Sequence, residues 1–270
     1  MIADDRGYEA IFQQFESPLM SRVRAEAYGE DIGQHSWVNA ADLRRDIERL
    51  RLVPASRLLD LGCGPCGPLT YVVRVTGSSG VGVDVSAAAV EAGRARTTRL
   101  GLNDSVSVQQ GDLNASLPFA AASFDAVISF DMVLHLDDRS HLFREVKRVL
   151  TPGGRFLFTD AGIRTGTLSD DELAQRSTHG RTKLVAPGFN ERMLESAGLS
   201  LLEVEDRTAS VLANAEGRLA ARVAHRRELE EVEGAATWER ERGYLETVIA
   251  VSRRGALSRM MYLAESKGTT

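Results

Sequence analysis

The chain is poor in cysteine and in long hydrophobic runs, and it has no excess of positive charge. Its 270 residues include two cysteines, too few for a disulfide framework or for a zinc site with four cysteine ligands. No stretch approaches the roughly 18–20 apolar residues needed to span a bilayer. The formal net charge is −5, whereas surfaces that bind nucleic acid are usually basic. The sequence therefore argues against a disulfide-stabilised, a membrane-spanning or a nucleic-acid-binding protein.

Other features that are absent lead to further expectations. Residues 1–6 are acidic and contain no apolar signal core, so we expect a cytoplasmic protein. His135 and His141 lack a convincing set of further ligands in the sequence, so we expect no metal site. The arginine-rich segments are interleaved with Asp and Glu, as on solvated helix faces. We therefore expect no nucleic-acid or membrane partner, and the sequence leaves the oligomeric state open.

From residue 56 onward, short apolar segments alternate with helical segments. Segments rich in Val, Ile and Leu are typical of parallel strands that are buried on both faces. This order predicts an α/β fold, with a parallel sheet covered by helices on both sides. We expect strands at 57–61, 80–85, 105–109, 124–130, 155–160, 199–205 and 256–264.

The first part of the chain has a different, helical pattern. Pro18 is expected to kink or end the first helical segment. Asn39, followed by Asp42, resembles a capping box that opens another helix. We expect 1–53 to form an N-terminal helical cap over a main domain at 54–270.

Two segments of the main domain depart from the alternating pattern. Residues 161–188 are rich in Gly, Thr and Ser and form a candidate lid, with a short helix at 169–176. Residues 210–252 form one long, charged helical stretch, which we interpret as an insertion.

The segment from Leu58 to Gly67 fits three different chemistries. Cys63-Gly-Pro-Cys66 is the dithiol of a thiol–disulfide oxidoreductase. Gly62, Gly64 and Gly67 have the spacing of a dinucleotide-binding turn. Asp60, followed by Gly62 and Gly64 after an apolar run, matches the turn that binds S-adenosylmethionine.

The charge of Asp60 separates these readings. An aromatic residue usually precedes the first cysteine of a redox pair, and here that residue is Gly62. Asp84 stands where the ribose-binding carboxylate of a dinucleotide site belongs. Asp60, however, would lie beside the pyrophosphate of a dinucleotide, and the two negative charges would repel each other. S-adenosylmethionine instead carries a sulfonium and an ammonium, which a carboxylate attracts. The sequence therefore favours the methyl donor.

Residues 56–162 resemble the core of the class I S-adenosylmethionine-dependent methyltransferases. The resemblance rests on five motifs in the family's order, at 58–64, 81–86, 110–113, 124–131 and 150–158. It implies a Rossmann-like, seven-stranded and mostly parallel sheet with an antiparallel last strand. The segment after the fourth strand is similar to the small-molecule branch that includes phosphoethanolamine and sarcosine/dimethylglycine methyltransferases.

The resemblance also implies roles for individual residues toward the cofactor. Gly62 and Gly64 would admit its methionine part, with Asp60 orienting the ammonium. Asp84 would accept both ribose hydroxyls, because a carboxylate offers only acceptors. Asp112 would accept from the adenine amino group. The other expected cofactor contacts are Leu113, Val85, Phe130, Tyr28 and Ser36.

Asp131 and His135 are the candidate catalytic residues. If a helical turn begins after Phe130, their four-residue spacing places both side chains on one face. His135 could take a proton from an N–H or O–H nucleophile, although a packing role in the loop is equally compatible with the sequence. We expect Tyr8 to pack between helices, with a phenol donor that reaches the site as the alternative, and we expect His179 to be exposed to solvent.

The expected reaction is direct, in-line methyl transfer to a nitrogen or oxygen of a small molecule. Three alternatives stay open: methylation of an apolar acceptor at carbon, a rearrangement or cyclisation that uses S-adenosylmethionine without transfer, and a non-catalytic partner subunit.

Overall fold

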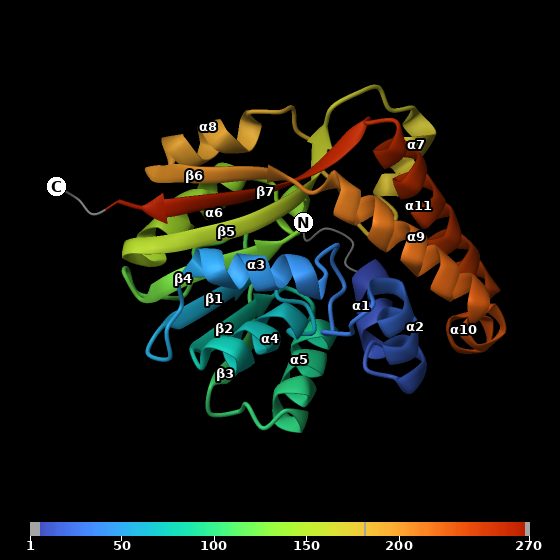
Figure 1. Cartoon of the computed structure of the whole chain (residues 1–270), viewed down its shortest axis with the longest axis horizontal. Coiled ribbons are helices and arrows are strands. Elements are labelled where there is room, and N and C mark those ends of the chain that lie inside the picture. Colours follow the sequence, from blue (N-terminus) through green and yellow to red (C-terminus); the bar gives the residue numbers. More distant parts are fainter. Residues whose placement is uncertain (1–5, 181, 268–270) are drawn as a thin grey trace.

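A computed structural model describes residues 6–180 and 182–267, and Figure 1 shows its arrangement around one seven-stranded sheet. The strand order is β3-β2-β1-β4-β5-β7-β6. Strands β1 to β5 run parallel, and β7 is antiparallel to both β5 and β6. The predicted α/β class and the antiparallel last strand are confirmed. The strands are β1 (Arg57–Leu61), β2 (Ser79–Asp84), β3 (Val106–Gln110), β4 (Phe124–Phe130), β5 (Leu150–Arg164), β6 (Leu199–Asp206) and β7 (Leu257–Ser266).

Helices pack on both faces of the sheet, as the apolar strands require. On one face, Leu43, Leu69 and Val90 from three successive helices join one buried cluster with the strands. On the other face, Phe143 and Leu194 belong to a second cluster. The first set is α3 (Ala40–Leu50), α4 (Gly67–Thr76) and α5 (Ala87–Arg99), and the second is α6 (Arg139–Val149) and α8 (Phe189–Ser196).

The remaining helices gather at one end of the sheet, on the right of Figure 1. Helix α2 packs on α9, and α11 packs on α7, α9 and α10. Segments from the two ends of the chain thus form one helical group beside the sheet. Its members are α1 (Arg6–Gln13), α2 (Pro18–Tyr28), α7 (Asp170–Arg176), α9 (Thr208–Ala224), α10 (Arg226–Glu233) and α11 (Ala235–Arg253).

In the first part of the chain, Asn39 opens a helix as expected, whereas Pro18 begins a helix instead of kinking or ending one. Pro18 is the first residue of α2, and Ser17 caps that helix through Met20 N. The Asn39 side chain accepts a hydrogen bond from Asp42 N and so opens α3. Proline suits a first helical position because its missing N–H would have no partner there.

The structure corrects two expectations about chain segments. The stretch 210–252 is broken at His225 and at Gly234, whose φ of 84° and ψ of 149° cannot belong to a helix. The first residues of 161–188 continue β5 to Arg164 rather than starting a loop. Residues 1–5 of the expected cap and residue 181 of the expected lid lie outside the described residues.

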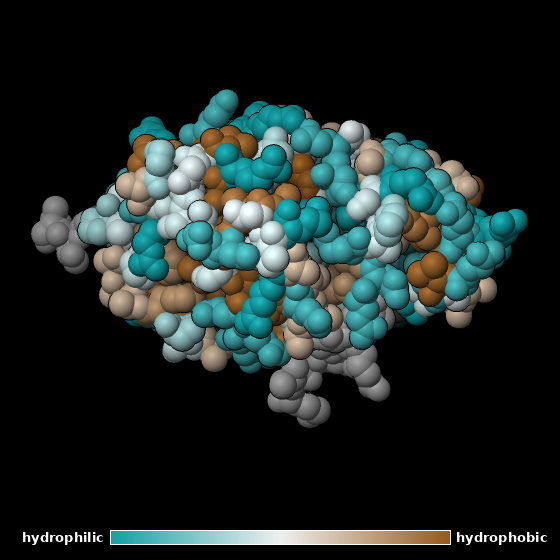
Figure 2. Space-filling model, turned by 90° about the horizontal axis from the view of Figure 1, so that it is seen from below, coloured by the Kyte–Doolittle hydropathy of each residue, from teal (hydrophilic) through white to brown (hydrophobic). Residues whose placement is uncertain are grey.

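The surface is mostly hydrophilic on the face shown in Figure 2, where brown residues are interrupted by teal and white ones. Among the helices of the described residues, none is both long and apolar enough to cross a membrane.

Candidate functional site

A cavity of about 370 Å³ opens at the carboxyl ends of the central strands. In the strand order, β2 lies on one side of β1 and β4 lies on the other. Successive connections therefore diverge from β1, which leaves a crevice where ligands bind in open α/β sheets. Helix α1, the loop between α2 and α3, and helices α9 and α11 close the cavity.

The turn after β1 is shaped by two glycines that line the cavity. Gly62 has a φ of +73°, and a Cβ there would lie 2.3 Å from Cγ of Met132. Gly64 has a φ of +52°. Because side chains are disfavoured in this left-handed region, both positions suit glycine. Gly67 serves another purpose, since a Cβ there would lie 2.0 Å from the Gly33 carbonyl oxygen.

Asp60 offers the cavity a carboxylate oxygen with no partner. The residue is 1% exposed, and its Oδ2 has no hydrogen bond within the described part of the chain. Burial, and then the nearby charge of Asp84, raises the pKa of Asp60 well above its ordinary value. An unpaired buried carboxylate is costly, and a cationic ligand group relieves that cost. The position fits the ammonium of S-adenosylmethionine.

Asp84 is held at the end of β2 by two backbone donors. Gly64 N donates to Oδ2 at 2.8 Å, and Ser86 N donates to Oδ1 at 2.9 Å. A carboxylate offers only acceptors, and the residue lines the cavity together with Val85. This geometry is compatible with the expected contact to the ribose hydroxyls.

The expected adenine wall comes from the ends of β3 and β4. Leu113 and Phe130 are buried, and both line the cavity. Asp112 is exposed at its rim, where its Oδ1 accepts hydrogen bonds from the backbone and side chain of Asn114. Asp112 is therefore oriented by its own loop.

Of the two cofactor contacts expected at the end of α2 and in the loop that follows it, one lines the cavity and the other does not. Ser36 lines the cavity, whereas Tyr28 is not among the residues that line it. The Tyr28 hydroxyl donates to the Ser36 carbonyl oxygen at 3.0 Å. The structure thus corrects the expectation for Tyr28, which supports the loop instead of facing the ligand.

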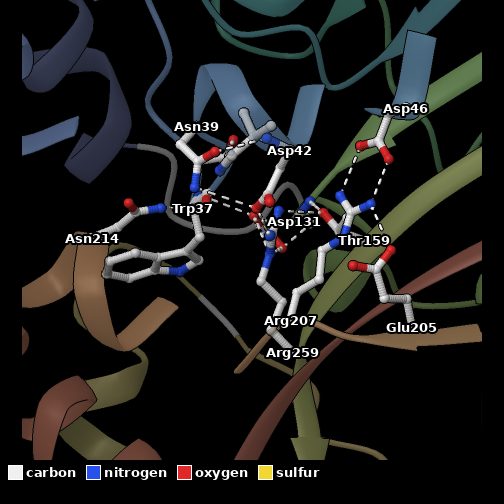
Figure 3. Close-up of polar contacts among 12 residues, drawn as sticks. Trp37, Asn39, Asp42, Asp46, Asp131, Thr159, Glu205, Arg207, Asn214 and Arg259 are labelled. Atoms are coloured by element: carbon white, nitrogen blue, oxygen red, sulfur yellow. Dashed lines mark hydrogen bonds and ion pairs between the residues drawn. The ribbon is translucent and has the colours of Figure 1, made fainter. Parts of the chain in front are cut away.

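Asp131 links the loop between α2 and α3 to the sheet through hydrogen bonds, as Figure 3 shows. Its carboxylate accepts hydrogen bonds from Trp37 N at 3.0 Å and from the Thr159 hydroxyl at 2.9 Å. It also forms an ion pair with Arg259 Nε at 2.9 Å. Arg207 and Asp46 form a second buried pair beside it, at 2.8 Å.

The geometry around Asp131 differs from the one assumed for catalysis. Its φ is +55°, so no regular helical turn begins after Phe130. A 3-10 turn, η1 (Val133–His135), follows instead. The Asp131 carboxylate is bonded to Trp37, Thr159 and Arg259. We therefore propose a positioning role for Asp131 in place of the expected catalytic one.

His135 meets Tyr8, which the sequence analysis had assigned to helix packing. The Tyr8 hydroxyl lies 3.2 Å from His135 Nε2, and both residues line the cavity. Burial raises the pKa of Tyr8 above its ordinary value, so the hydroxyl keeps its proton. A signal was present in the sequence, because Tyr8 precedes the buried Phe12 by four residues and so shares its helix face.

Two further histidines lie around Tyr8. Its ring centroid is 5.7 Å from that of His35 and 5.9 Å from that of His179. Burial, followed by the charge of Arg218, lowers the pKa of His35 to about 3. His179 is buried, and its Nε2 lies 2.6 Å from Glu241 Oε1. The expectation of an exposed His179 is therefore wrong, because α11 supplies a buried partner.

The Glu241 carboxylate is expected to make folding sensitive to acid. Burial would raise the pKa of Glu241, but the hydrogen bond and charge of His179, followed by the charges of Arg218 and Arg222, outweigh burial and hold this pKa at about 2, below the ordinary 4.5. A carboxyl group whose pKa is lowered by folding stabilises the protein above its unfolded value. That stabilisation, about 3 kcal/mol by linkage, is lost as the pH falls from 4.5 toward 2.

Unfolding by urea at about pH 6 and about pH 3 measures this contribution. At the higher pH, Glu241→Gln should have a lower free energy of unfolding than the wild type. At the lower pH, this difference in the free energy of unfolding should be smaller. Glu246→Gln, on the exposed side of the same helix, serves as the control. A difference for Glu241→Gln that stays constant over this pH range would contradict the prediction.

The two cysteines are buried in the turn rather than poised for redox chemistry. Their sulfur atoms lie 3.4 Å apart, and both thiols are free. The hydrogen bond from Cys66, and then burial, raises the pKa of Cys63 well above its ordinary value. Reactive cysteines have lowered pKa values, so the geometry does not favour the oxidoreductase reading.

Metal ligands are not assembled in the described part of the chain. No three His, Cys, Asp or Glu side chains there come together so that they could hold a metal ion.

Comparisons with known proteins agree with this geometry. A family model described as a methyltransferase domain matches residues 59–158. Methyltransferase GfsG of Streptomyces halstedii is 36% identical over 59% of this chain and 58% of its own length. The 27-O-demethylrifamycin SV methyltransferase of Amycolatopsis mediterranei is 31% identical over 74% of this chain and 75% of its own length.

Other relatives are named for N-methylation of glycine, sarcosine and dimethylglycine, for N-methylation of phosphoethanolamine, and for C-methylation of sterols. The chain spans 29% to 58% of the length of these three and of the Streptomyces relative. Among solved structures, the (4+2)-cyclase SpnF superimposes with a TM-score of 0.75 at 23% identity, over 98% of this chain and 95% of its own. At that identity, the likeness shows the fold alone.

Proposed function

Because the chain belongs to the S-adenosylmethionine-dependent methyltransferases, we propose that it methylates a nitrogen or oxygen atom of a small molecule. The observation that carries this proposal is the contact of Tyr8 with His135, 3.2 Å apart in the cavity that also holds Asp60 and Asp84. A proton-accepting group thus shares one enclosed space with the residues suited to the cofactor.

The residues of the cofactor end have distinct tasks. Asp60 pairs with the ammonium, Asp84 accepts from the ribose hydroxyls, and the turn at Gly62 and Gly64 admits the methionine part. S-adenosylmethionine, when bound, supplies a methyl group that is already activated by the sulfonium. The protein therefore contributes mainly alignment and exclusion of water.

The acceptor end supplies proton transfer. His135 Nε2 takes the proton of an attacking N–H or O–H group, either directly or through the Tyr8 hydroxyl. Neutral imidazole suits this task because its ordinary pKa lies near neutrality. Tyr8 cannot itself become a ready base, since burial raises its pKa.

The enclosure of the cavity favours a small acceptor. Tyr8 and Phe12 of α1 cover one side, and Trp37, Arg218 and Tyr244 cover another. An open basic channel, which a nucleic-acid substrate needs, is not formed by these described residues.

A labelled-methyl assay against a metabolite extract of the producing organism tests the proposal. His135→Ala should lower kcat by about 100- to 10,000-fold, because a positioned base is lost. The loss should be smaller at high pH, where the acceptor ionises without help. Tyr8→Phe should lower kcat less than His135→Ala does. The control is His225→Ala, which should leave kcat unchanged because the His225 ring contacts Glu26 outside the cavity.

Two results would count against this function. If His135→Ala leaves the chemical step unchanged across pH, His135 is not the base. If substrate is consumed without release of S-adenosylhomocysteine, the protein uses its cofactor for a reaction other than methyl transfer.

A further inference from the structure

Two arginines line the cavity, and neither has a carboxylate partner among the described residues. Arg176 comes from α7 and Arg218 from α9. Neither side chain forms an ion pair with any described residue. Arg176 donates to the Tyr244 hydroxyl at 2.8 Å, while its Nε is buried and has no hydrogen-bond partner among the described residues. The Arg218 guanidinium lies 5.0 Å from the centre of the Trp37 ring.

These arginines belong to the acceptor side of the cavity. The Trp37 ring stacks on Tyr244 with centroids 6.3 Å apart, so the two guanidinium groups lie on one aromatic wall. The Tyr244 ring contacts His179 at 4.6 Å, and His179 in turn approaches Tyr8. A continuous series of contacts therefore joins both arginines to the proposed proton-transfer pair.

Among the buried arginines of the described residues, Arg176 is the exception in having no carboxylate within 4 Å. Arg218 is half-buried, whereas the seven buried arginines other than Arg176 in the described residues each lie within 4 Å of a carboxylate, namely Arg24, Arg96, Arg139, Arg155, Arg207, Arg222 and Arg259. A buried charge without a counter-charge costs several kcal/mol. Glu241 interacts with Arg218 through space, but its Oε1 is bonded to His179.

We propose that the methyl acceptor carries an oxyanion, a carboxylate or a phosphate, which pairs with Arg176 and Arg218. This inference rests on the proposed function, because it places the anion beside the groups that act on the nucleophile. The planar guanidinium groups offer paired donors that match both kinds of oxyanion. The anion supplies a hydrogen-bonded counter-charge, which the two arginines receive from no described residue, and it fixes the orientation of the acceptor.

Titration with simple probes tests this assignment. Benzoate, phenyl phosphate and neutral benzamide share one ring and differ in charge, and NMR shifts or calorimetry on the full chain report their binding. We expect at least one anion to bind about 10-fold or more tightly than benzamide, and the stronger of the two identifies the oxyanion. Arg218→Gln and Arg176→Gln should each remove that preference.

The matched control is Arg44→Gln, an exposed arginine outside the cavity that pairs with Glu30. Equal binding of benzamide and the anions, no anion binding at millimolar concentration, or a preference that survives in Arg218→Gln would overturn the inference. If Arg176→Gln does not fold, as judged by its unfolding transition, Arg218→Gln decides alone.

The titrations are run with and without S-adenosylhomocysteine. Failure of S-adenosylhomocysteine to bind would contradict the proposed function, while the anion preference is still measured on the protein alone. Binding of S-adenosylhomocysteine without an anion preference would contradict only the assignment of the arginines.

Discussion

Asp84→Ala is expected to weaken S-adenosylmethionine binding by about 100- to 1000-fold. Hydrogen bonds to a charged group contribute about 1.5–3 kcal/mol each, and we propose that the carboxylate accepts two from the ribose. At about 1.5–2 kcal/mol each, the lower part of that range, the two bonds amount to about 3–4 kcal/mol, which gives this fold-change. The substitution also removes the acceptor for Gly64 N and Ser86 N, which hold the turn beside the cavity.

Calorimetry with S-adenosylmethionine measures the effect, and Asp112→Ala is the comparison. Asp112 is exposed at the rim and is already bonded to Asn114, so its loss should weaken binding much less. Unchanged affinity in Asp84→Ala would contradict the ribose assignment. Tighter binding of NAD than of S-adenosylmethionine by the wild type would contradict the reading of the cavity as a methyl-donor site.

Asp131→Asn is expected to lower the free energy of unfolding by about 3–5 kcal/mol. Arg259 is buried, and the substitution removes its closest counter-charge, so that the nearest remaining carboxylate is Asp42, 3.9 Å away. Loss of one partner of a buried ion pair is strongly destabilising. For a chain of this size, the melting temperature should fall by about 10 °C. The same change loosens the attachment of the loop at Trp37 to the sheet.

Two further variants separate the causes. Replacing Arg259 with Met in the Asp131→Asn background should recover part of the stability, because the unpaired charge is removed. Glu228→Gln breaks an exposed pair with Arg22 and should cost less than about 1 kcal/mol. If Asp131→Asn keeps its melting temperature and loses only methyl transfer, Asp131 acts in catalysis, as the sequence suggested.

Much of the architecture could be predicted because its signals are local. Strands β1 and β4 begin and end where their apolar runs do, since a strand buried on both faces needs such a run. Asn39 marks a helix start through the hydrogen-bonding needs of the first helical turn, whereas Pro18 begins a helix although it was expected to kink or end one. The break at Gly234 was missed, because charged residues on both sides keep the helical pattern.

The sequence by itself determined the α/β sheet and the character of the turn after β1. The requirements there belong to single positions: a carboxylate at Asp60, and backbone angles at Gly62 and Gly64 that side chains disfavour. Only the tertiary structure decided what surrounds His135. Tyr8 lies 127 residues away from it in the chain, and His179 meets Glu241 across 62 residues.

The acceptor side of the cavity was beyond sequence reasoning for the same reason. A buried polar group can act as a base, position a neighbouring loop or remain an unpaired charge. Its role depends on which partners the packing of distant elements brings to it. Asp131 is bonded to Arg259 and to Trp37, which is why we propose a positioning role for it. Arg176 and Arg218 form no ion pair with a carboxylate of the described residues. Periodicity reports which face of an element is buried, but the contacts between distant elements arise only when the chain has folded.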